Sequence, residues 1–410
     1  MEKRVVVTGI GAVTPLGVDF QRSWEAVKQG RTGIDLCTKG LLLAGRQKRV
    51  AAGEIEKSFD PHRYLSPKEA GRTDPFVWYA VSAASMAAED AFTEGGWRGG
   101  SGCSVIIGSS RGGVTRLEEA ASTERYSAFL MPGSHAGAAA SHIARKLGVT
   151  GRTLGLSSAC ASGMQAVGEG YTYIKNGLET MCLCGGAEAP LARFCVEAYY
   201  RCGALSRTPA PWASRPFDSG RDGFVLAEGA CVLVLEELEH ALQRGTETKT
   251  NTKTRIYGEI CGYGCGMDAC HDTRPDPSGQ ARAMEKALEG AGLAAENIGL
   301  LLAHATGTRL GDKAEEEAIK LAFGERASTV PVFAAKALTG HMLAASGPFE
   351  AALALMCVRE GLLPGNKNLK KQEGGLNLPA RTQNAPVRAA MANSFGLGGF
   401  NASVVIKRYE

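Results

Sequence analysis

The chain has 410 residues, of which 44% are hydrophobic and 21% are charged, and its formal net charge at pH 7 is +4. These fractions are those of an ordinary globular protein with two domains or one large layered unit. The small net charge gives no support to nucleic-acid binding, although it allows a local basic patch for an acidic partner. No segment approaches the length of a membrane span.

The cysteines and the start of the chain indicate the compartment. Twelve cysteines are spread along the chain in apolar settings, and the first residues, MEKR, are followed by only a short apolar run. We therefore expect no signal peptide, no disulfide framework and no membrane association, and a reducing, cytoplasmic compartment.

The first half of the chain alternates between expected strands and helices. Residues 5–11, VVVTGIG, predict a buried strand that enters a glycine turn. A dinucleotide loop is not expected there, because Thr14 stands where the G-x-G-x-x-G pattern needs its last glycine. Residues 39–59 are expected to form an irregular basic surface stretch. We expect further strands at 104–108, 181–186 and 230–236, and helices at 19–30, from 66, at 76–91 and at 136–147.

The same alternation resumes after residues 245–253, GTETKTNTK, which are polar and are expected to form a surface linker. Strands are expected at 256–262, 299–304, 330–335 and 403–406, and helices at 278–292, 312–322 and 343–361. This order predicts a layered α/β fold, although no internal repeat is apparent. Cys261, Cys265, Cys270 and His271 are unevenly spaced and lack a second pair, so no metal site is expected.

One cysteine has the setting of a nucleophile. Cys160 lies between the apolar run that begins at Thr153 and a helical pattern carried by Met164, Val167 and Tyr171. A helix start favours a thiolate, and the small neighbours leave room for a substrate at the sulfur. A buried, inert cysteine is the alternative, so the remaining chain has to supply partners for the sulfur.

Two histidines stand in comparable settings. His304 follows an expected strand and opens a small polar loop, where site residues often lie in α/β folds. His341 precedes an expected helix, whose free N–H groups would keep the imidazole neutral. Lys336 lies five residues before His341, and Glu350 on the following helix is a candidate partner for a buried lysine. Either histidine taken alone could equally be structural.

The chain as a whole resembles the beta-ketoacyl-acyl-carrier-protein synthases of the elongating, Cys-His-His type. The resemblance is carried by segments that occur in the order typical of that family, namely VVVTGIGAVTPLG, SSACASGMQAVGEG, GGAEA, ASRPFDSGRDGFVLAEGA, HATGTRLGDKAE, KALTGHMLAASGPFEA and NSFGLGGFNAS. It implies the thiolase fold, in which two pseudo-symmetric βαβαβαββ halves form five α-β-α-β-α layers. The halves would be residues 1–254, with Cys160, and 255–410, with His304 and His341, usually in a homodimer; a heterodimer with a related subunit is also possible.

The resemblance also implies a reaction. Cys160 would receive an acyl group from an acyl-carrier thioester, and His304 and His341 would stabilise the enolate formed when malonyl-carrier protein loses CO2. The enolate would attack the acyl group and give a 3-oxoacyl product. Lys336, held through Glu350, would keep the histidine region in order. No metal or redox cofactor is implied. The phosphopantetheine group that the reaction uses arrives on the carrier protein.

Further positions take roles only through the resemblance. The backbone N–H groups of Cys160 and Leu397 would form an oxyanion hole. The other assignments are the phosphopantetheine-binding residues Thr306 and Thr308, the acyl-pocket or gate residues Arg111, Phe395, Leu397 and Phe400, and the docking residues for an acidic carrier, Lys68, Arg72 and Arg207.

Three residues depart from the fatty-acid pattern. Leu397 stands where phenylalanine is common, Phe400 where threonine is common, and Arg111 where a small or apolar residue lines the acyl pocket. A charge at that depth does not suit a long alkyl chain, so a structural position of Arg111 at a dimer interface is slightly favoured. These departures leave the acyl type and chain length open.

Several alternative functions therefore stay open. A ketosynthase of a type II polyketide or polyene pathway is the main one. A thiolase would need a second cysteine near the C-terminus, and the chain has none after Cys357. A non-catalytic partner subunit would lack Cys160, and a cysteine hydrolase would not need two histidines and a lysine.

Overall fold

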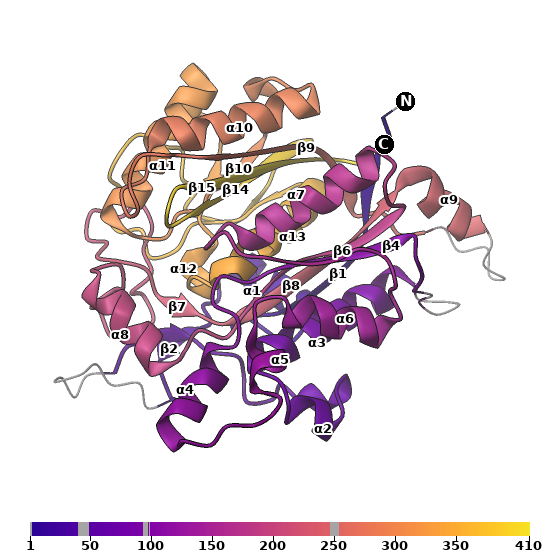
Figure 1. Cartoon of the computed structure of the whole chain (residues 1–410). Helices are drawn as coiled ribbons and strands as arrows, with labels where there is room; N and C mark the ends of the chain where they lie inside the picture. The colour runs from indigo at the N-terminus through magenta and orange to yellow at the C-terminus, as the bar shows by residue number, and fades with distance from the viewer. Residues whose placement is uncertain (1, 40–48, 93–96, 98, 247–253) are drawn as a thin grey trace.

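The computed structural model describes residues 2–39, 49–92, 97, 99–246 and 254–410. Figure 1 shows five layers, in which two sheet regions enclose a central pair of helices and carry further helices on their outer faces. The strands of these regions form one ten-stranded sheet in the order β11-β10-β14-β15-β9-β1-β8-β6-β4-β5. This arrangement agrees with the predicted five layers.

The two sheet regions have matching strand orders. One contains β1 (Val5–Val13), β8 (Gly229–Glu237), β6 (Met181–Glu188), β4 (Cys103–Gly108) and β5 (Thr153–Leu156). The other contains β9 (Gly258–Met267), β15 (Phe400–Lys407), β14 (Ala389–Gly396), β10 (Leu300–Leu302) and β11 (Val332–Phe333). They meet where β1 pairs with β9. One continuous sheet contains strands from both sides of the predicted domain boundary at 254/255. The boundary itself stays a prediction.

The helices occupy three layers. The central pair is α7 (Ser162–Lys175) and α13 (Ser346–Glu360); α3 (Pro75–Ala91) and α6 (Ala138–Leu147) cover one outer face, and α10 (Pro277–Ala291) and α11 (Arg309–Phe323) cover the other (Figure 1). The remaining helices are α1 (Phe20–Gln29), α2 (Pro67–Ala70), α4 (Val114–Thr123), α5 (Leu130–Ser134), α8 (Arg193–Arg201), α9 (Leu238–Thr246) and α12 (Lys336–Thr339), with 3-10 turns at Pro61–Arg63, Ala295–Asn297, Gly324–Ser328 and Leu343–Ala345.

Glycines bring strands unusually close to the outer helices, in the same way in both halves. A Cβ added to Gly11 on β1 would lie 2.0 Å from the carbonyl oxygen of Ala83 on α3. A Cβ added to Gly264 on β9 would lie 2.1 Å from the carbonyl oxygen of Ala283 on α10. The sequence interpretation of a glycine turn at residues 9–11 was therefore wrong. The strand continues to Val13, and the glycines serve close helix packing.

We expect Gly11→Ala to lower the free energy of unfolding by about 1–3 kcal/mol, because its methyl group would overlap the α3 backbone, which cannot move aside as a side chain could. The measurement is urea unfolding monitored by circular dichroism. Gly266→Ala in β9 is the control, since nothing lies within 4 Å of its added Cβ. Equal stabilities of the two variants would contradict this packing argument.

Other expected elements differ in detail. The stretch 39–59 contains the buried strand β3 (Ala51–Gly53), which pairs with β2 (Ile34–Leu36) and β7 (Leu226–Ala227), so it is not wholly irregular surface. The sequence reading also missed β14 and the pair β12 (Leu362–Leu363) and β13 (Gln383–Asn384). Most of the predicted linker, residues 247–253, lies outside the described residues. Within the described ranges, no helix is long and apolar enough to span a membrane.

Candidate active site

The candidate residues follow the carboxyl ends of strands in both halves of the sheet. Cys160 lies between β5 and α7, His304 follows β10, and Lys336 and His341 follow β11. Parallel pairing of β4 with β5 and of β10 with β11 places such chain ends at one edge of each half. One residue from the first half therefore meets three from the second where the halves join.

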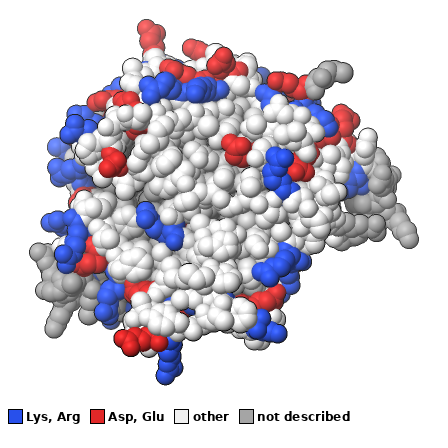
Figure 2. Space-filling model, viewed as in Figure 1, with Lys and Arg blue, Asp and Glu red and all other residues white. Residues whose placement is uncertain are grey.

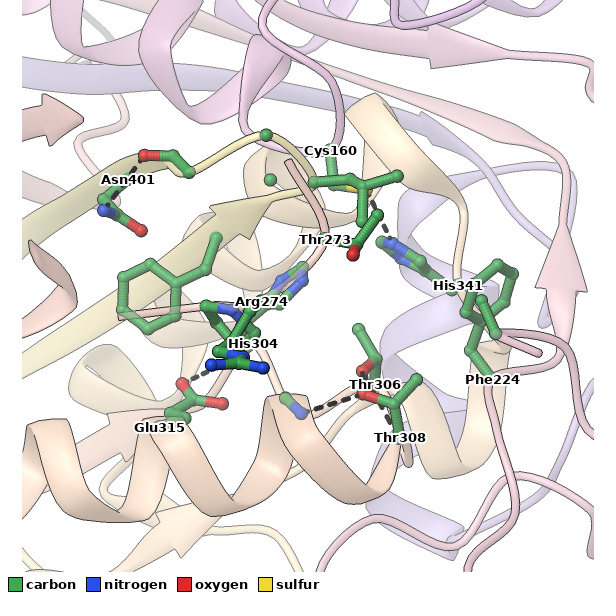
Figure 3. A pocket seen from close by; sticks show the side chains of 18 of the residues that line it. Cys160, Phe224, Thr273, Arg274, His304, Thr306, Thr308, Glu315, His341 and Asn401 are labelled. Atoms are coloured by element: carbon green, nitrogen blue, oxygen red, sulfur yellow. Dashed lines mark hydrogen bonds between the residues drawn. The ribbon is translucent and has the colours of Figure 1, made fainter. Parts of the chain in front are cut away.

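The sulfur and one imidazole are in direct contact. Cys160 Sγ lies 3.1 Å from His341 Nε2 (Figure 3). On the other side of the ring, His341 Nδ1 lies 3.3 Å from Ser346 Oγ, which accepts a hydrogen bond from the Met342 backbone N–H. Because Ser346 Oγ is already an acceptor, it is free to donate to Nδ1. This leaves the proton of a neutral His341 on Nε2, facing the sulfur.

The second imidazole lies against the first. The ring centroids of His304 and His341 are 5.3 Å apart with an interplanar angle of 82°. Burial, followed by the charge of Lys336, holds the pKa of each histidine well below its usual value; for His304, His341 adds to the effect. Both rings are therefore neutral at pH 7, which the sequence predicted for His341, and His304 Nδ1 has no hydrogen-bond partner among the described residues.

The pairing expected for Lys336 is confirmed. Its Nζ lies 2.6 Å from Glu350 Oε1, and both side chains are 1% exposed. Burial raises the pKa of Glu350 to about 7, against the opposing effect of Lys336. Separating a buried ion pair leaves an unpaired charge in the protein interior, which costs much free energy. The two side chains therefore hold each other in place.

The surroundings of Cys160 differ from one expectation. Cys160 precedes the first turn of α7, as predicted. Burial nevertheless raises the pKa of its thiol, although the Leu397 backbone N–H and the charges of Lys336 and Arg111 act in the opposite direction. The prediction that the helix start makes a thiolate the favoured form is therefore wrong. The resting group is a thiol in contact with a neutral imidazole.

Backbone strain is concentrated beside the same side chains. Ala159 (φ 51°) precedes Cys160, Ala305 (φ 39°) follows His304, and Leu343 (φ 47°) lies two residues after His341. Alanine and leucine rarely adopt positive φ, and such residues persist where the surrounding structure fixes them. The turn Leu343–Ala345 is packed tightly against the other half at the Ala344 carbonyl oxygen. A Cβ added to Gly163 of α7 would lie 2.0 Å from this oxygen, and one added to Gly186 of β6 would lie 2.2 Å from it.

A cavity of about 130 Å³ opens onto these groups, which is room for a substrate rather than a single ordered water. Thr306, Thr308, Phe395 and Leu397 line it, and the two threonine hydroxyls are 3.0 Å apart (Figure 3). Their expected roles in binding phosphopantetheine and in the acyl pocket stay predictions. Phe400 does not belong to the described lining. It is partly buried and packs against the core, because alternation along β15 gives the cavity side to Asn401.

Arg111 also lines the cavity, together with Cys160. Its guanidinium carbon lies 5.5 Å from the centroid of the Tyr199 ring on α8. The side chain contributes to the wall of the cavity and is exposed in the single chain, so its expected position at a dimer interface stays a prediction.

The expected docking residues are exposed but separate. Lys68 on α2 is exposed, Arg72 stacks over Phe129 at 3.8 Å, and Arg207 lies over Tyr200 at 5.3 Å. Figure 2 shows Lys and Arg side chains distributed along the margins of one face, with acidic side chains among them and a broad uncharged centre. The structure gives no contact that joins Arg207 to the other two among the described residues.

Sequence reasoning missed several supporting side chains. Glu315 on α11 accepts hydrogen bonds from the backbone N–H groups of His304 and Ala305, both at 2.7 Å, and burial raises its pKa to about 7. Ser394 Oγ donates to the Cys160 carbonyl oxygen at 3.1 Å. The signal for Glu315 was a carboxylate on the buried side of a helix, three residues after Asp312. No comparable local signal marked Ser346 or Ser394.

Relatives of known type match the whole chain. The 3-oxoacyl-[acyl-carrier-protein] synthase 2 of Synechocystis is 37% identical over 422 residues, covering 100% of this chain and 99% of that protein. The protein of the same name from Coxiella burnetii is 35% identical over 422 residues, with the same coverage. A solved beta-ketoacyl synthase from Burkholderia phymatum has a TM-score of 0.90 at 31% identity and covers 100% of both chains.

A second group of structures comes from polyketide-type proteins. The structure titled the ishigamide ketosynthase/chain length factor has a TM-score of 0.90 at 30% identity, again with 100% of both chains covered. The family model of the beta-ketoacyl synthase N-terminal domain matches residues 2–241, and that of the C-terminal domain matches residues 257–370. With its thiolase fold and its joined Cys160, His304 and His341, the chain belongs to the beta-ketoacyl synthase family.

Proposed function

We propose that this protein catalyses the decarboxylative condensation of a Cys160-bound acyl group with malonyl-acyl-carrier protein to give 3-oxoacyl-acyl-carrier protein in fatty acid elongation. The observation that carries the proposal is the contact of the Cys160 sulfur with a neutral imidazole at 3.1 Å, with a second neutral imidazole against the first in one cavity. Relatives named 3-oxoacyl-[acyl-carrier-protein] synthase 2 support the same reaction.

The first half-reaction transfers the acyl group. Cys160 Sγ attacks the carbonyl carbon of an acyl-carrier thioester, and the carrier thiol leaves with the proton that Cys160 gives up. Lys336 and Arg111 stabilise the negative sulfur during attack. The Leu397 backbone N–H, directed at Cys160, supports the proposed oxyanion hole together with the N–H of Cys160 itself.

The second half-reaction forms the carbon–carbon bond. Malonyl-carrier protein loses CO2, and its electron pair becomes an enolate whose oxygen accepts hydrogen bonds from His304 and His341. Neutral rings suit this role because they donate without competing as bases. The enolate carbon attacks the acyl carbon, Cys160 leaves as a thiolate, and the sulfur takes up a proton from water. Lys336 and Glu350 act as positioning residues behind the histidines.

The partners follow from this reaction. An acidic acyl-carrier protein docks at Lys68, Arg72 and Arg207, and its phosphopantetheine passes Thr306 and Thr308; no metal or redox cofactor takes part in the proposed reaction. The solved complex of the AntDE ketosynthase with its acyl-carrier protein AntF is that of a relative 27% identical. The unpaired edge of β5, with alternating exposed residues, supports assembly as a dimer.

A type II polyketide or polyene ketosynthase is the second candidate function. The observation that favours it is Arg111 in the wall of the cavity, where a long saturated chain would leave a guanidinium without water. The similarity to the ishigamide and AntDE structures also favours this second candidate. The two candidates use the same chemistry and differ in the acyl group.

The experiment that tests the proposed reaction separates its two halves with His341→Ala. We expect this variant to lose malonyl decarboxylation by about 10²–10³-fold, the effect of removing one oxyanion donor. It should still become acylated at Cys160, because the sulfur remains. Mass spectrometry of the acyl-protein and release of labelled CO2 measure the two halves.

The matched control for that experiment is His142→Ala on α6, a histidine outside the cavity lining. We expect it to retain both half-reactions. Loss of Cys160 acylation together with undiminished decarboxylation in His341→Ala would contradict the assigned role. Absence of any 3-oxoacyl product from the unmodified protein, across acyl-carrier substrates of several chain lengths, would overturn the proposed function itself.

A further inference from the structure

The wall of the cavity beside Cys160 carries a cation that no carboxylate in the described part of the chain neutralises by direct contact. Within the described residues, Arg111 forms no salt bridge. Its guanidinium is placed by Tyr199, whose ring packs edge-on against Phe224 with centroids 5.3 Å apart. Phe224 in turn packs edge-on against His341 at 5.4 Å. A row of rings thus connects the cation to the candidate catalytic pair.

The acidic group whose charge acts on Arg111 is Glu188 at the end of β6. It is fully buried and accepts a hydrogen bond from the Ser110 backbone N–H. Burial raises the pKa of Glu188 to about 8, against the opposing effects of the Ser110 N–H and of the charge of Arg111. Among the described residues, no salt bridge joins this carboxyl to the Arg111 guanidinium, so direct neutralisation is left to a substrate.

The two buried carboxylates that line the cavity are already engaged. Glu315 accepts the two backbone N–H groups that follow β10. Asp268 accepts from the Asn401 side chain at 2.6 Å and from the Asp276 backbone N–H at 3.0 Å. Asp272 lies on the exposed loop that also carries Arg274. On the wall formed by the segment after β4 and by α8, the charge that faces substrate is positive.

We propose that Arg111 makes the Cys160 cavity selective for acyl groups that carry a carboxylate, that is, for half-thioesters of dicarboxylic acids. This inference rests on the proposed function and names its acyl substrate class. A guanidinium offers five N–H donors in a planar fork that fits a carboxylate in two parallel hydrogen bonds. A methyl-terminated chain in the same place would remove water from those N–H donors without offering them an acceptor. Binding of such a chain is therefore disfavoured.

The test compares acyl groups that differ only in their terminal group. Pantetheine thioesters of succinic, adipic and suberic acids are offered beside the corresponding monomethyl esters and the methyl-terminated acyl groups of equal carbon number. Rates of Cys160 acylation are measured by mass spectrometry of the intact protein. We expect at least one of the free acids to load about tenfold or more faster than its own methyl ester, which has the same chain without the charge.

The variant Arg111→Met should remove that preference, and Arg111→Lys should retain part of it, since the charge stays while the fork is lost. Loss of a cation near the sulfur can slow every thioester, so the ratio between free acid and ester is the readout. Arg63→Met is the matched control: Arg63 lies over the Tyr64 ring at 5.1 Å, outside the cavity lining, and its loss should leave the ratio unchanged.

Three results would overturn the inference. They are equal loading of free acids and esters by the unmodified protein, a preference that survives unchanged in Arg111→Met, and a change of oligomeric state in Arg111→Met, measured by light scattering, without a change in the ratio. The last result would assign Arg111 to a subunit interface. Failure of all thioesters to acylate Cys160 would be different, because it would overturn the proposed function as well.

Discussion

Replacing Cys160 with alanine should abolish both acyl-enzyme formation and condensation. Among the described residues, the sulfur is the only group in contact with His341 Nε2 that can accept an acyl group, and the methyl group of alanine cannot. We expect product formation to fall at least about 10³-fold, the scale seen when the nucleophile of an acyl-transfer site is removed. The measurements are mass spectrometry of the protein after incubation with acyl-carrier substrate and assay of 3-oxoacyl product.

Two further variants make that result specific. Cys160→Gln should retain malonyl decarboxylation, because it removes the nucleophile and leaves both imidazoles in place. Cys202→Ala, at an exposed cysteine on the molecular surface, should behave as the unmodified protein. Condensation that persists in Cys160→Ala, or acylation found on another cysteine, would refute the role assigned to this sulfur.

The second large effect concerns stability. Replacing Lys336 with methionine should lower the free energy of unfolding at pH 7 by about 3–5 kcal/mol, because it leaves the Glu350 carboxyl buried without its partner. The double variant Lys336→Met/Glu350→Gln should recover most of that loss. Urea unfolding of the four proteins in this cycle gives the coupling between the two side chains.

The pH dependence of this loss has a definite sign. A carboxyl whose pKa is higher in the folded than in the unfolded protein opposes folding as pH rises, since the unfolded chain releases its proton more readily. Removal of Lys336 takes away an influence that lowers the pKa of Glu350. The destabilisation should therefore be smaller at pH 5 than at pH 8.

A pair on α11 whose lysine is exposed provides the control for the stability experiment. Lys320 Nζ lies 2.7 Å from Glu316 Oε1, with the lysine side chain 54% exposed. Lys320→Met should cost less than about 1 kcal/mol, because water and salt screen the exposed lysine and Glu316 keeps its hydrogen bond from the Gly375 backbone N–H. Equal losses in the free energy of unfolding for Lys336→Met and Lys320→Met would contradict the argument that burial makes the Lys336–Glu350 pair costly to break.

The residues that sequence could place were those with local signals. Cys160 lies between an apolar run and a helix pattern, and His304 follows a buried strand, so both were placed correctly from periodicity and small-residue loops. The full layered architecture required the resemblance carried by seven segments. Periodicity alone gave alternating elements without the order of the strands, since that order depends on pairing between distant segments.

The failures came from contacts that are distant in sequence. Gly9 and Gly11 were read as a turn, because nothing local shows that α3 packs on that strand. Phe400 was assigned to the gate, but the register of β15 turns it toward the core and gives Asn401 to the cavity. The thiolate prediction counted the helix start and not the burial of the sulfur. Each error concerns the surroundings of a residue in the folded chain, namely what packs against it or how deeply it is buried. The residue types themselves indicated the chemistry of the site.

The glycine contacts around Ala344 have a consequence for how the enzyme works. Its carbonyl oxygen fills the space that a side chain on Gly163 or Gly186 would take, so backbone from the histidine-bearing half is wedged against backbone from the cysteine-bearing half. Such a junction does not allow the halves to swing apart and close again at every turnover. Entry of one acyl chain and departure of another must then depend on small shifts at the rim, such as the exposed loop at residues 271–274.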